Sequence, residues 1–466
     1  MKKLLISAAA VGSLFAQPTI EDLQKQLQAL QAQIQELKKA QETQAKEVKE
    51  VKSSQETVAE NLQGVKQAHY EDHINFHFSI RSALDAIHYK TESGKVFDNT
   101  VLSNKVNLTG LAKVNDNLKA TLKLEAYNVF GMNNPKNNND NNANSNWTAN
   151  ETPDDTNIRV REAFFNYFFG EDGEYMFSAG RRPAVGGYPA NLRENEVPTS
   201  PIAHLINMEF DGFSLWFRPD ALGSLGEDYG TNLKFCFGRG YSSIDNPRYS
   251  YMQGSNRPNN DMGGFLFVPY NDDQYSVWWE QIYAWNVMGN NDTTNPNNME
   301  ALGNFIGTNI IFKADGIGDG ISDFLDDTKA FISFAWTKTD PDDNKQMLGS
   351  SSSRTGSSIW VGADMDGFGD NDRWGLNYVH GSKYFRPMTY GEDTLAGSIA
   401  AVRGSAYEVY YDRQLMEHLT ANFRATYFDY NYAGSDAYFG NNGNPDQDDY
   451  IDKASDIRAY IKYQYW

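Results

Sequence analysis

Residues 118–127, LKATLKLEAY, alternate strictly between two kinds of side chain. Leucine and alanine occupy one set of alternate positions, whereas lysine, threonine, glutamate and tyrosine occupy the other. A period of two is typical of a β-strand with one apolar and one polar face. The apolar face needs a partner, which is either the core of a soluble protein or the hydrocarbon of a membrane.

The same alternation recurs along the chain from about Ile74 to the C-terminus. It is clearest in residues 74–86, 106–112, 232–237, 329–337, 419–427 and 457–465. Repeated short segments of this kind are the signature of a transmembrane β-barrel. When residues 206–218, INMEFDGFSLWFR, count as one bulged strand, the pattern predicts about sixteen antiparallel strands.

The lengths of the connecting segments support this interpretation. Short links, such as 115–117, 170–174 and 416–418, alternate with long polar links, such as 131–157, 290–298 and 441–453. Outer-membrane barrels have short periplasmic turns and long external loops in this order. A soluble β-sandwich is the alternative for any one strand, but so many half-apolar strands would leave large apolar bands exposed to water.

Composition excludes several other classes of protein. The 466 residues carry a formal net charge of −20, which disfavours binding to nucleic acid, and mean hydropathy is −0.62. The single cysteine, Cys236, excludes an internal disulfide framework. Walker, HExxH and GxSxG motifs do not occur in the sequence, and DMDGFGDND (364–372) lacks the spacing of an EF-hand. The sequence therefore predicts no cofactor, no metal site and no enzymatic activity.

The first seventy residues differ from the rest. Residues 1–16 have a basic start, an apolar stretch and a final Ala16, which is the layout of a signal peptide. Residues 17–70 repeat apolar side chains with a heptad spacing that predicts a periplasmic coiled coil, with a single amphipathic helix as the alternative. β-Branched residues at both core positions favour three strands. The predicted coiled-coil core comprises Leu23, Leu27, Leu30, Ile34, Leu37, Val48, Val51, Val58, Leu62 and Val65. Residues 71–466 then form the predicted outer-membrane barrel.

Two stretches resemble known families. Residues 161–183, REAFFNYFFGEDGEYMFSAGRRP, resemble the strand-turn-strand segment of general bacterial porins that precedes the loop folded into the pore. Residues 378–398, YVHGSKYFRPMTYGEDTLAGS, and 403–411, RGSAYEVYY, resemble a Gram-negative outer-membrane family of unknown function whose members are described as candidate porins. The resemblance implies a homotrimer of sixteen-strand barrels.

If this resemblance holds, residues 184–204 form the constriction loop. Glycine and proline permit an irregular path there, and Glu194 and Glu196 supply negative charge. The alternative is an ordinary surface loop.

Charged residues on the polar phase of the strands are candidates for the pore lining. The predicted basic set comprises Arg81, Lys113, Lys119, Lys123, Arg182, Arg424, Arg458 and Lys462, and the predicted acidic wall set comprises Glu280, Glu408 and Asp412. Opposed charges across a narrow aqueous pore would favour polar over apolar solutes. The alternative is that these residues merely keep the lumen wet.

Taken together, these patterns predict a channel for passive diffusion of ions and small hydrophilic solutes. The expected surroundings are outer-membrane lipid and lipopolysaccharide, with peptidoglycan or another periplasmic partner at the coiled coil. The alternative function is a structural anchor that tethers the envelope through residues 17–70. A lipid-facing pair, His380 and Ser382, is the one arrangement that would suit a hydrolase, and it lacks a recognisable third partner.

Overall fold

The computed structural model of the protein describes residues 74–130, 158–241, 259–291, 299–318, 320–369 and 371–465. The chain divides into two units, Met1–His73 and Ile74–Trp466. The predicted signal peptide and coiled coil lie outside the described residues, as does the long link 131–157. The account that follows concerns the second unit.

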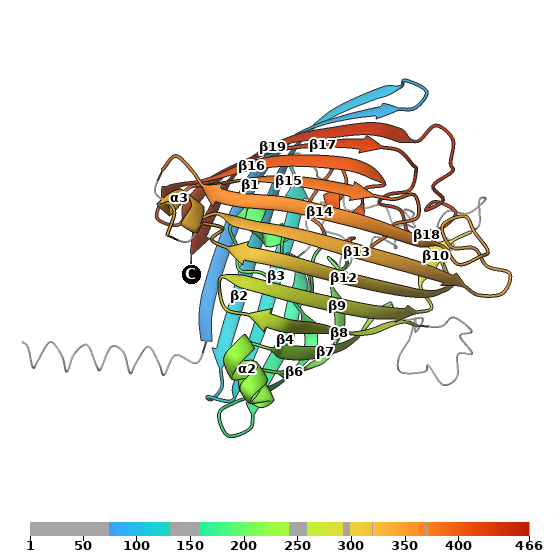
Figure 1. The fold of residues 1–466 in the computed structure, drawn as a ribbon. Coiled ribbons are helices and arrows are strands. Elements are labelled where there is room, and N and C mark those ends of the chain that lie inside the picture. The colour runs from blue at the N-terminus through green and yellow to red at the C-terminus, as the bar shows by residue number, and fades with distance from the viewer. Residues whose placement is uncertain are drawn as a thin grey trace, which may run out of the picture. The chain divides into compact units, whose positions relative to one another are not determined.

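Among the described residues, sixteen antiparallel strands form one closed barrel, as the alternation predicts. Each strand pairs with the barrel strand that precedes or follows it in the chain, and the first strand closes on the last (Figure 1). The barrel strands are β1 (Ile74–Thr91), β2 (Val96–Lys113), β3 (Leu118–Val129), β4 (Ile158–Phe169), β5 (Tyr175–Arg182), β6 (Phe210–Phe217), β7 (Asn232–Tyr241), β8 (Asn260–Asn271), β9 (Tyr275–Trp285), β12 (Gly303–Asp315), β13 (Lys329–Pro341), β14 (Thr355–Asp366), β15 (Arg373–Gly381), β16 (Gly404–Met416), β17 (Leu419–Tyr430) and β19 (Ile451–Tyr465).

The two ends of the barrel differ in their connections. One end, here the short-turn end, holds tight turns together with the helical links η2 (Pro219–Leu222), α2 (Ser224–Tyr229) and α3 (Asp323–Asp326). The other end, here the long-loop end, holds the longer loops and a small sheet of β10 (Met288–Asn290), β11 (Glu300–Ala301) and β18 (Phe439–Gly440) (Figure 1). The connection between β1 and β2 lies at the long-loop end but is short, which departs from the predicted alternation of short and long links.

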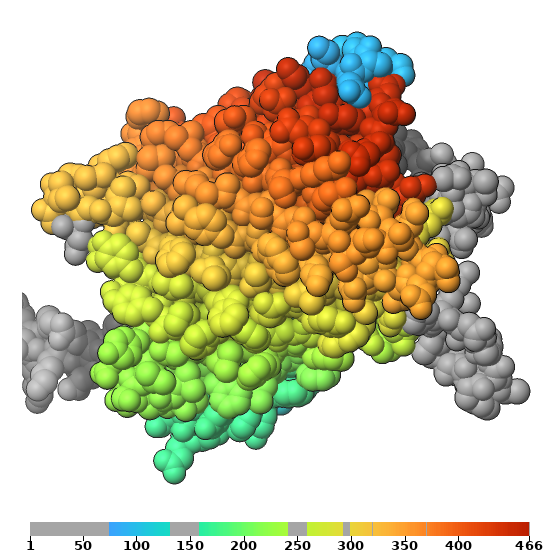
Figure 2. Space-filling model, turned by 45° about the vertical axis from the view of Figure 1, so that its right-hand side comes forward, coloured from blue at the N-terminus to red at the C-terminus, as the bar shows by residue number. Residues whose placement is uncertain are grey.

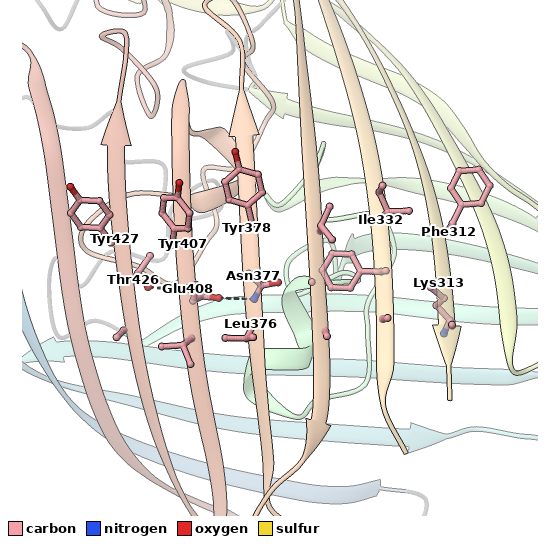
Figure 3. Close-up of a pocket in the computed structure, with 18 of the residues that line it drawn as sticks. Phe312, Lys313, Ile332, Leu376, Asn377, Tyr378, Tyr407, Glu408, Thr426 and Tyr427 are labelled. Carbon is pink, nitrogen blue, oxygen red and sulfur yellow. Dashed lines mark hydrogen bonds between the residues drawn. The ribbon is translucent and has the colours of Figure 1, made fainter. Parts of the chain in front are cut away.

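Side chains alternate between the two faces of the wall as the sequence predicts. In β3, Leu122 on the apolar phase is 47% exposed on the outside, whereas Glu125 on the polar phase is 6% exposed. Figure 3 shows the same arrangement on neighbouring strands, where tyrosines project outward and the Asn377–Glu408 hydrogen bond of 3.1 Å lies on the other side of the sheet. The hollow in this view has a volume of about 1140 Å³ and belongs mainly to the apolar outer surface.

The outer surface carries large apolar side chains on successive strands. In Figure 2 the colours run from green to red across one face, so segments that follow one another in the chain form a continuous surface there. Exposed examples are Ile80, Leu108, Leu122, Phe165, Phe213, Phe235, Trp279, Phe312, Phe334, Val361, Leu376, Tyr407, Phe423 and Ile461. A band of this extent suits hydrocarbon and not water. The sandwich alternative is wrong, because one closed sheet replaces two packed ones.

The buried core lies inside the barrel. Side chains of two inner loops, 183–209 and 382–403, pack against inward side chains of the wall, including Phe331, Trp360 and Phe428. These loops contain the short helices η1 (Ala190–Glu194) and η4 (Ile399–Ala401). In the part of the chain that the structure describes, no helix is both long and apolar enough to cross a membrane.

Candidate functional site: the charged lumen

The first inner loop, residues 183–209, enters the barrel after β5. Its apolar residues Ile202, Ala203 and Leu205 are fully buried, so the loop is fixed by packing and not only by polar contacts. Gly187 permits the close approach of the loop to itself, because a Cβ at this position would lie 1.9 Å from the carbonyl oxygen of Pro201. The segment 184–204 therefore lies inside the lumen, where the resemblance to porins placed it.

A buried histidine fixes this loop to the wall. The two ring nitrogens of His204 lie 2.9 Å from the hydroxyl oxygens of Ser333 on β13 and Ser358 on β14. Asn309 on β12 donates to the same Ser333 oxygen at 2.8 Å. Burial lowers the pKa of His204 to about 3, so the imidazole is neutral and serves as one donor and one acceptor.

The second inner loop, residues 382–403, was not predicted from the sequence. It pairs with the first loop through backbone hydrogen bonds between Asn207 and Met388 (2.8 Å) and between Met388 and Leu205 (2.9 Å). The buried guanidinium of Arg403 donates to the carbonyl oxygens of Phe385, Ala433 and Gly443 at 2.8–2.9 Å. The two loops therefore form one internal body.

Arg193 joins both loops to the wall. Its Nη2 lies 2.5 Å from Oε1 of Glu392 on the second loop, and its Nη1 lies 3.1 Å from Oε2 of Glu408 on β16. All three side chains are buried. Charged pairs in such surroundings are stable only when every partner is present.

A cluster of opposite charges surrounds Asp393 of the second loop. Arg81 contacts its carboxylate, Arg458 lies 3.2 Å from it and Lys105 lies 3.6 Å from it. Burial alone would raise the pKa of Asp393, but these three cations outweigh it and hold the pKa well below the usual range. Asp393 is therefore an anion inside the lumen.

The two predicted loop acids contact the basic wall directly. Glu194 accepts a hydrogen bond from Tyr460 and lies 3.6 Å from Arg424, and Glu196 lies 2.9 Å from Lys462. Both acids are therefore in contact with members of the predicted basic set, Arg424 and Lys462.

The lumen is asymmetric. On the side of β12–β17, the loops and wall pack through apolar side chains, including Tyr188, Phe331, Trp360 and Ile399. Next to β1–β4, β17 and β19, a cavity of about 140 Å³ remains between the loops and the wall. Its lining includes the cations Arg81, Lys105, Lys123, Arg161, Arg193, Arg424 and Lys462 and the acids Glu162, Glu194, Glu196, Glu209, Glu392 and Asp393.

The remaining predicted residues lie away from this cavity. At the short-turn end, Lys113 pairs with Asp116 at 2.8 Å and Lys119 lies over the ring of Phe168. Arg182 lies 3.4 Å from the carbonyl oxygen of Phe213, and Asp412 lies 3.4 Å from the side-chain amide of Asn422. Glu280 is buried in the wall of β9, beside Arg182 and Ile206.

Several charged residues of the site are not among those predicted from the sequence. Lys105 and Arg161 follow the polar phase of β2 and β4, so alternation could have identified them. Arg193, Glu392 and Asp393 lie in loops, where no periodicity marks an inward side chain. The available signal was the apolar content of residues 382–403, which a solvent-exposed loop would not need.

In the described residues, His380 and Ser382 do not form the hydrogen-bonded pair that a hydrolase would need. His380 contacts the hydroxyl of Ser405 at 3.1 Å, whereas Ser382 accepts a hydrogen bond from the backbone of Ser357 at 2.8 Å. Within the described residues, no cluster of three or more His, Cys, Asp or Glu side chains is arranged for a metal ion.

Comparison with solved structures gives matches at low sequence identity and with TM-scores below 0.5. The anion-selective porin from Comamonas acidovorans matches with a TM-score of 0.47 and 11% identity, covering 84% of this chain and 100% of that one. Pseudomonas putida OprB matches with a TM-score of 0.48 and 10% identity, covering 87% of this chain and 97% of that one. Vibrio cholerae OmpT in its trimer form matches with a TM-score of 0.45 and 12% identity, covering 84% and 99%.

None of the curated proteins compared with this chain matches it. A family model does match, over residues 95–465, and its description is "Protein of unknown function (DUF3373)". This span contains most of the barrel and both inner loops. The chain therefore belongs to the DUF3373 family.

Proposed function

We propose that the protein is an outer-membrane porin through which ions and small hydrophilic solutes diffuse passively. The asymmetry of the lumen carries the proposal. One side is filled by apolar packing, whereas the other keeps a cavity lined by charges of both signs. A barrel that served only as an anchor would have no need of a charged cavity within it.

The outer surface supports a membrane location. Its large apolar side chains require hydrocarbon, and a closed barrel satisfies every strand with backbone hydrogen bonds. We assign the short-turn end to the periplasm and the long-loop end to the exterior, because bacterial barrels have that asymmetry. This orientation places the start of β1 on the periplasmic side.

The charges of the cavity set its expected selectivity. Most wall cations that line the cavity lie within 4 Å of a carboxylate. The negative charge of the carboxylates therefore largely cancels the positive charge of the wall. Paired charges still order water and favour polar solutes over apolar ones. We therefore expect weak selectivity between anions and cations.

The finer features of the assembly are part of the same proposal. We infer a homotrimer, held in outer-membrane lipid and lipopolysaccharide, with a cleaved signal peptide at residues 1–16. The heptads of residues 17–70 support the trimeric state and would contact peptidoglycan or another periplasmic partner.

Single-channel recording tests the proposal. Full-length protein added to a planar lipid bilayer should produce discrete, ohmic conductance steps, and a variant that lacks residues 20–65 should retain them. Absence of steps from the full-length protein, in a preparation whose circular dichroism shows folded β-structure, would contradict the porin. Loss of steps only in the deletion variant would favour a role for the coiled coil in assembly, which cross-linking would then measure.

A further inference from the structure

A second cavity lies nearer the long-loop end and shares only Glu392 with the lining of the charged one. Its volume is about 480 Å³, within the range of sites that hold small molecules. Its lining comes from the second inner loop, from the loop 431–450 and from the adjoining ends of β1, β17 and β19. We call it the tyrosine cavity, since the described residues that line it include Tyr89, Tyr390, Tyr430, Tyr432, Tyr438 and Tyr450.

The tyrosines are held in place by contacts with one another and with the backbone. Tyr89 donates to the carbonyl oxygen of Leu395 at 2.6 Å, and Tyr450 donates to that of Asn431 at 3.0 Å. Tyr390 and Tyr438 stack with ring centroids 4.6 Å apart. Because the rings are fixed before any ligand arrives, they offer preorganised apolar surface at little entropic cost.

Polar groups at the cavity remain available to a ligand. Thr389 lines the cavity and is 4% exposed, and its buried hydroxyl has no hydrogen-bond partner among the described residues. An unpaired buried hydroxyl is unfavourable, so a ligand that paired with it would gain affinity. A Cβ on Gly397 would lie 2.7 Å from the hydroxyl of Tyr430 and 2.8 Å from a carboxylate oxygen of Asp436, so the glycine keeps space in front of both groups.

The charges around this cavity disfavour an ionic ligand. The guanidinium of Arg386 lies over the ring of Tyr390, 4.6 Å from its centroid, and Asp436 supplies a compensating negative charge. Glu392 also lines the cavity, but Arg193 neutralises it at 2.5 Å. A cation would meet Arg386 and an anion would meet Asp436.

We propose that the tyrosine cavity is a binding site for a neutral polyhydroxylated solute, of the class of a mono- or disaccharide. The C–H faces of a sugar ring pack on tyrosine rings, while its hydroxyl groups donate to Asp436, accept from Arg386 and either donate to or accept from the Thr389 hydroxyl. Both kinds of surface are present together at this site.

The site lies next to the proposed path. Glu392 lines both the tyrosine cavity and the charged cavity. The next residue, Asp393, lines the charged cavity, and Thr394 lines the tyrosine cavity. The segment 392–394 is thus the partition between them. This inference deepens the proposed function, on which it rests, by naming a class of solute that is captured before passage.

Isothermal titration calorimetry on the full-length protein in detergent tests binding without requiring conduction. Glucose, galactose, maltose and cellobiose are the probes, with choline chloride as a cationic comparison. At least one sugar should bind with a Kd of about 10 mM or tighter, whereas choline should not. Binding of choline but of none of the sugars, or of no probe, overturns the inference.

Variants locate the binding. Tyr438→Leu should abolish measurable binding, and Tyr438→Phe, which keeps the ring, should retain it. Thr389→Val should weaken it roughly three- to tenfold. Thr199→Val is the control, because its hydroxyl donates to Val185 in the first loop and does not line this cavity. Equal weakening by both threonine variants would place the sugar elsewhere. A protein that binds sugar but gives no bilayer conductance would refute the porin and leave the site intact, and the reverse result would refute only the site.

Discussion

At the scale of single residues, the lumen depends on buried charges with exact partners. Arg193 is the clearest case, because it lies between a carboxylate of the second loop and one of the wall. Removing one partner from such a group leaves the others charged and unpaired in a poorly solvated place.

Replacing Arg193 with glutamine should therefore destabilise the internal body by about 3–5 kcal/mol, since Glu392 and Glu408 would lose their shared cation. We expect a lower thermal transition in detergent and a noisier, larger single-channel current. The matched control is Arg239→Gln, whose guanidinium pairs with Asp261 at 2.6 Å on the exposed outer face and should cost about 1 kcal/mol or less. Equal effects of the two variants would contradict the role given to Arg193.

His204 gives the docked loop a dependence on pH. Its pKa is about 3 in the folded protein against an ordinary value of 6.5, so an undocked loop binds a proton below pH 6.5 that the docked loop does not. Docking should weaken as pH falls, by about 1.4 kcal/mol per unit below 6.5, until the pH approaches 3.

Hydrogen exchange of amides in residues 190–206 measures this dependence. Protection should fall between pH 7 and pH 5 in the wild type, after correction for intrinsic exchange rates. In His204→Gln, which does not titrate, it should start lower and change less. An identical pH dependence in both proteins would exclude the histidine as the cause.

Which residues face inward could be predicted, but not what they touch. The alternation assigns Arg81, Arg424, Arg458 and Lys462 to the inner face, where all four side chains are buried, since the side-chain period of a strand is fixed by backbone geometry. Their partners are in loops, where no period exists. Asp393 and Glu392 could therefore not be identified as lumen residues from sequence.

At the scale of elements, the strands and the first inner loop could be predicted, whereas the second inner loop could not. The strands have a repeating pattern, and the first loop was found by resemblance. The second loop was missed because a connector of this length reads as external, although Phe385, Met388 and Ile399 gave it an apolar content that water would not favour.

The second loop should restrict the channel. Replacing residues 390–398 with nine glycine and serine residues removes Glu392 and Asp393 together with the partition between the cavities. Single-channel conductance should rise. The same replacement at residues 222–230, which contain α2 at the short-turn end, is the control and should leave conductance close to wild type. A fall or no change in the first variant would show that the loop does not lie in the path.

Strand β3 tests which face contacts lipid. Leu122→Arg puts a charge on the outer face and should cost about 2–4 kcal/mol if this level lies near the middle of the membrane. Thr121→Arg, one residue away on the inner face, should cost less. Unfolding titrations in lipid vesicles compare the two, and a reversed order would refute the assignment of faces.

At the scale of the whole molecule, the compensation of charge in the lumen should govern selectivity. Asp393→Asn removes the anion around which Arg81, Arg458 and Lys105 gather, so the cavity becomes more positive. The reversal potential under a salt gradient should then shift toward anion permeability. Asp261→Asn on the outer face is the control, and a shift of the same size there would contradict a local origin.

The seam between β1 and β19 has a consequence for biogenesis. Their register joins Phe78–Thr91 to Ile451–Tyr465, so the earliest-made strand has no partner on one side until the last segment leaves the ribosome. A chain that has not yet reached β19 carries two unpaired strand edges, which favour aggregation. The barrel can therefore close only when β19 is present to pair with β1.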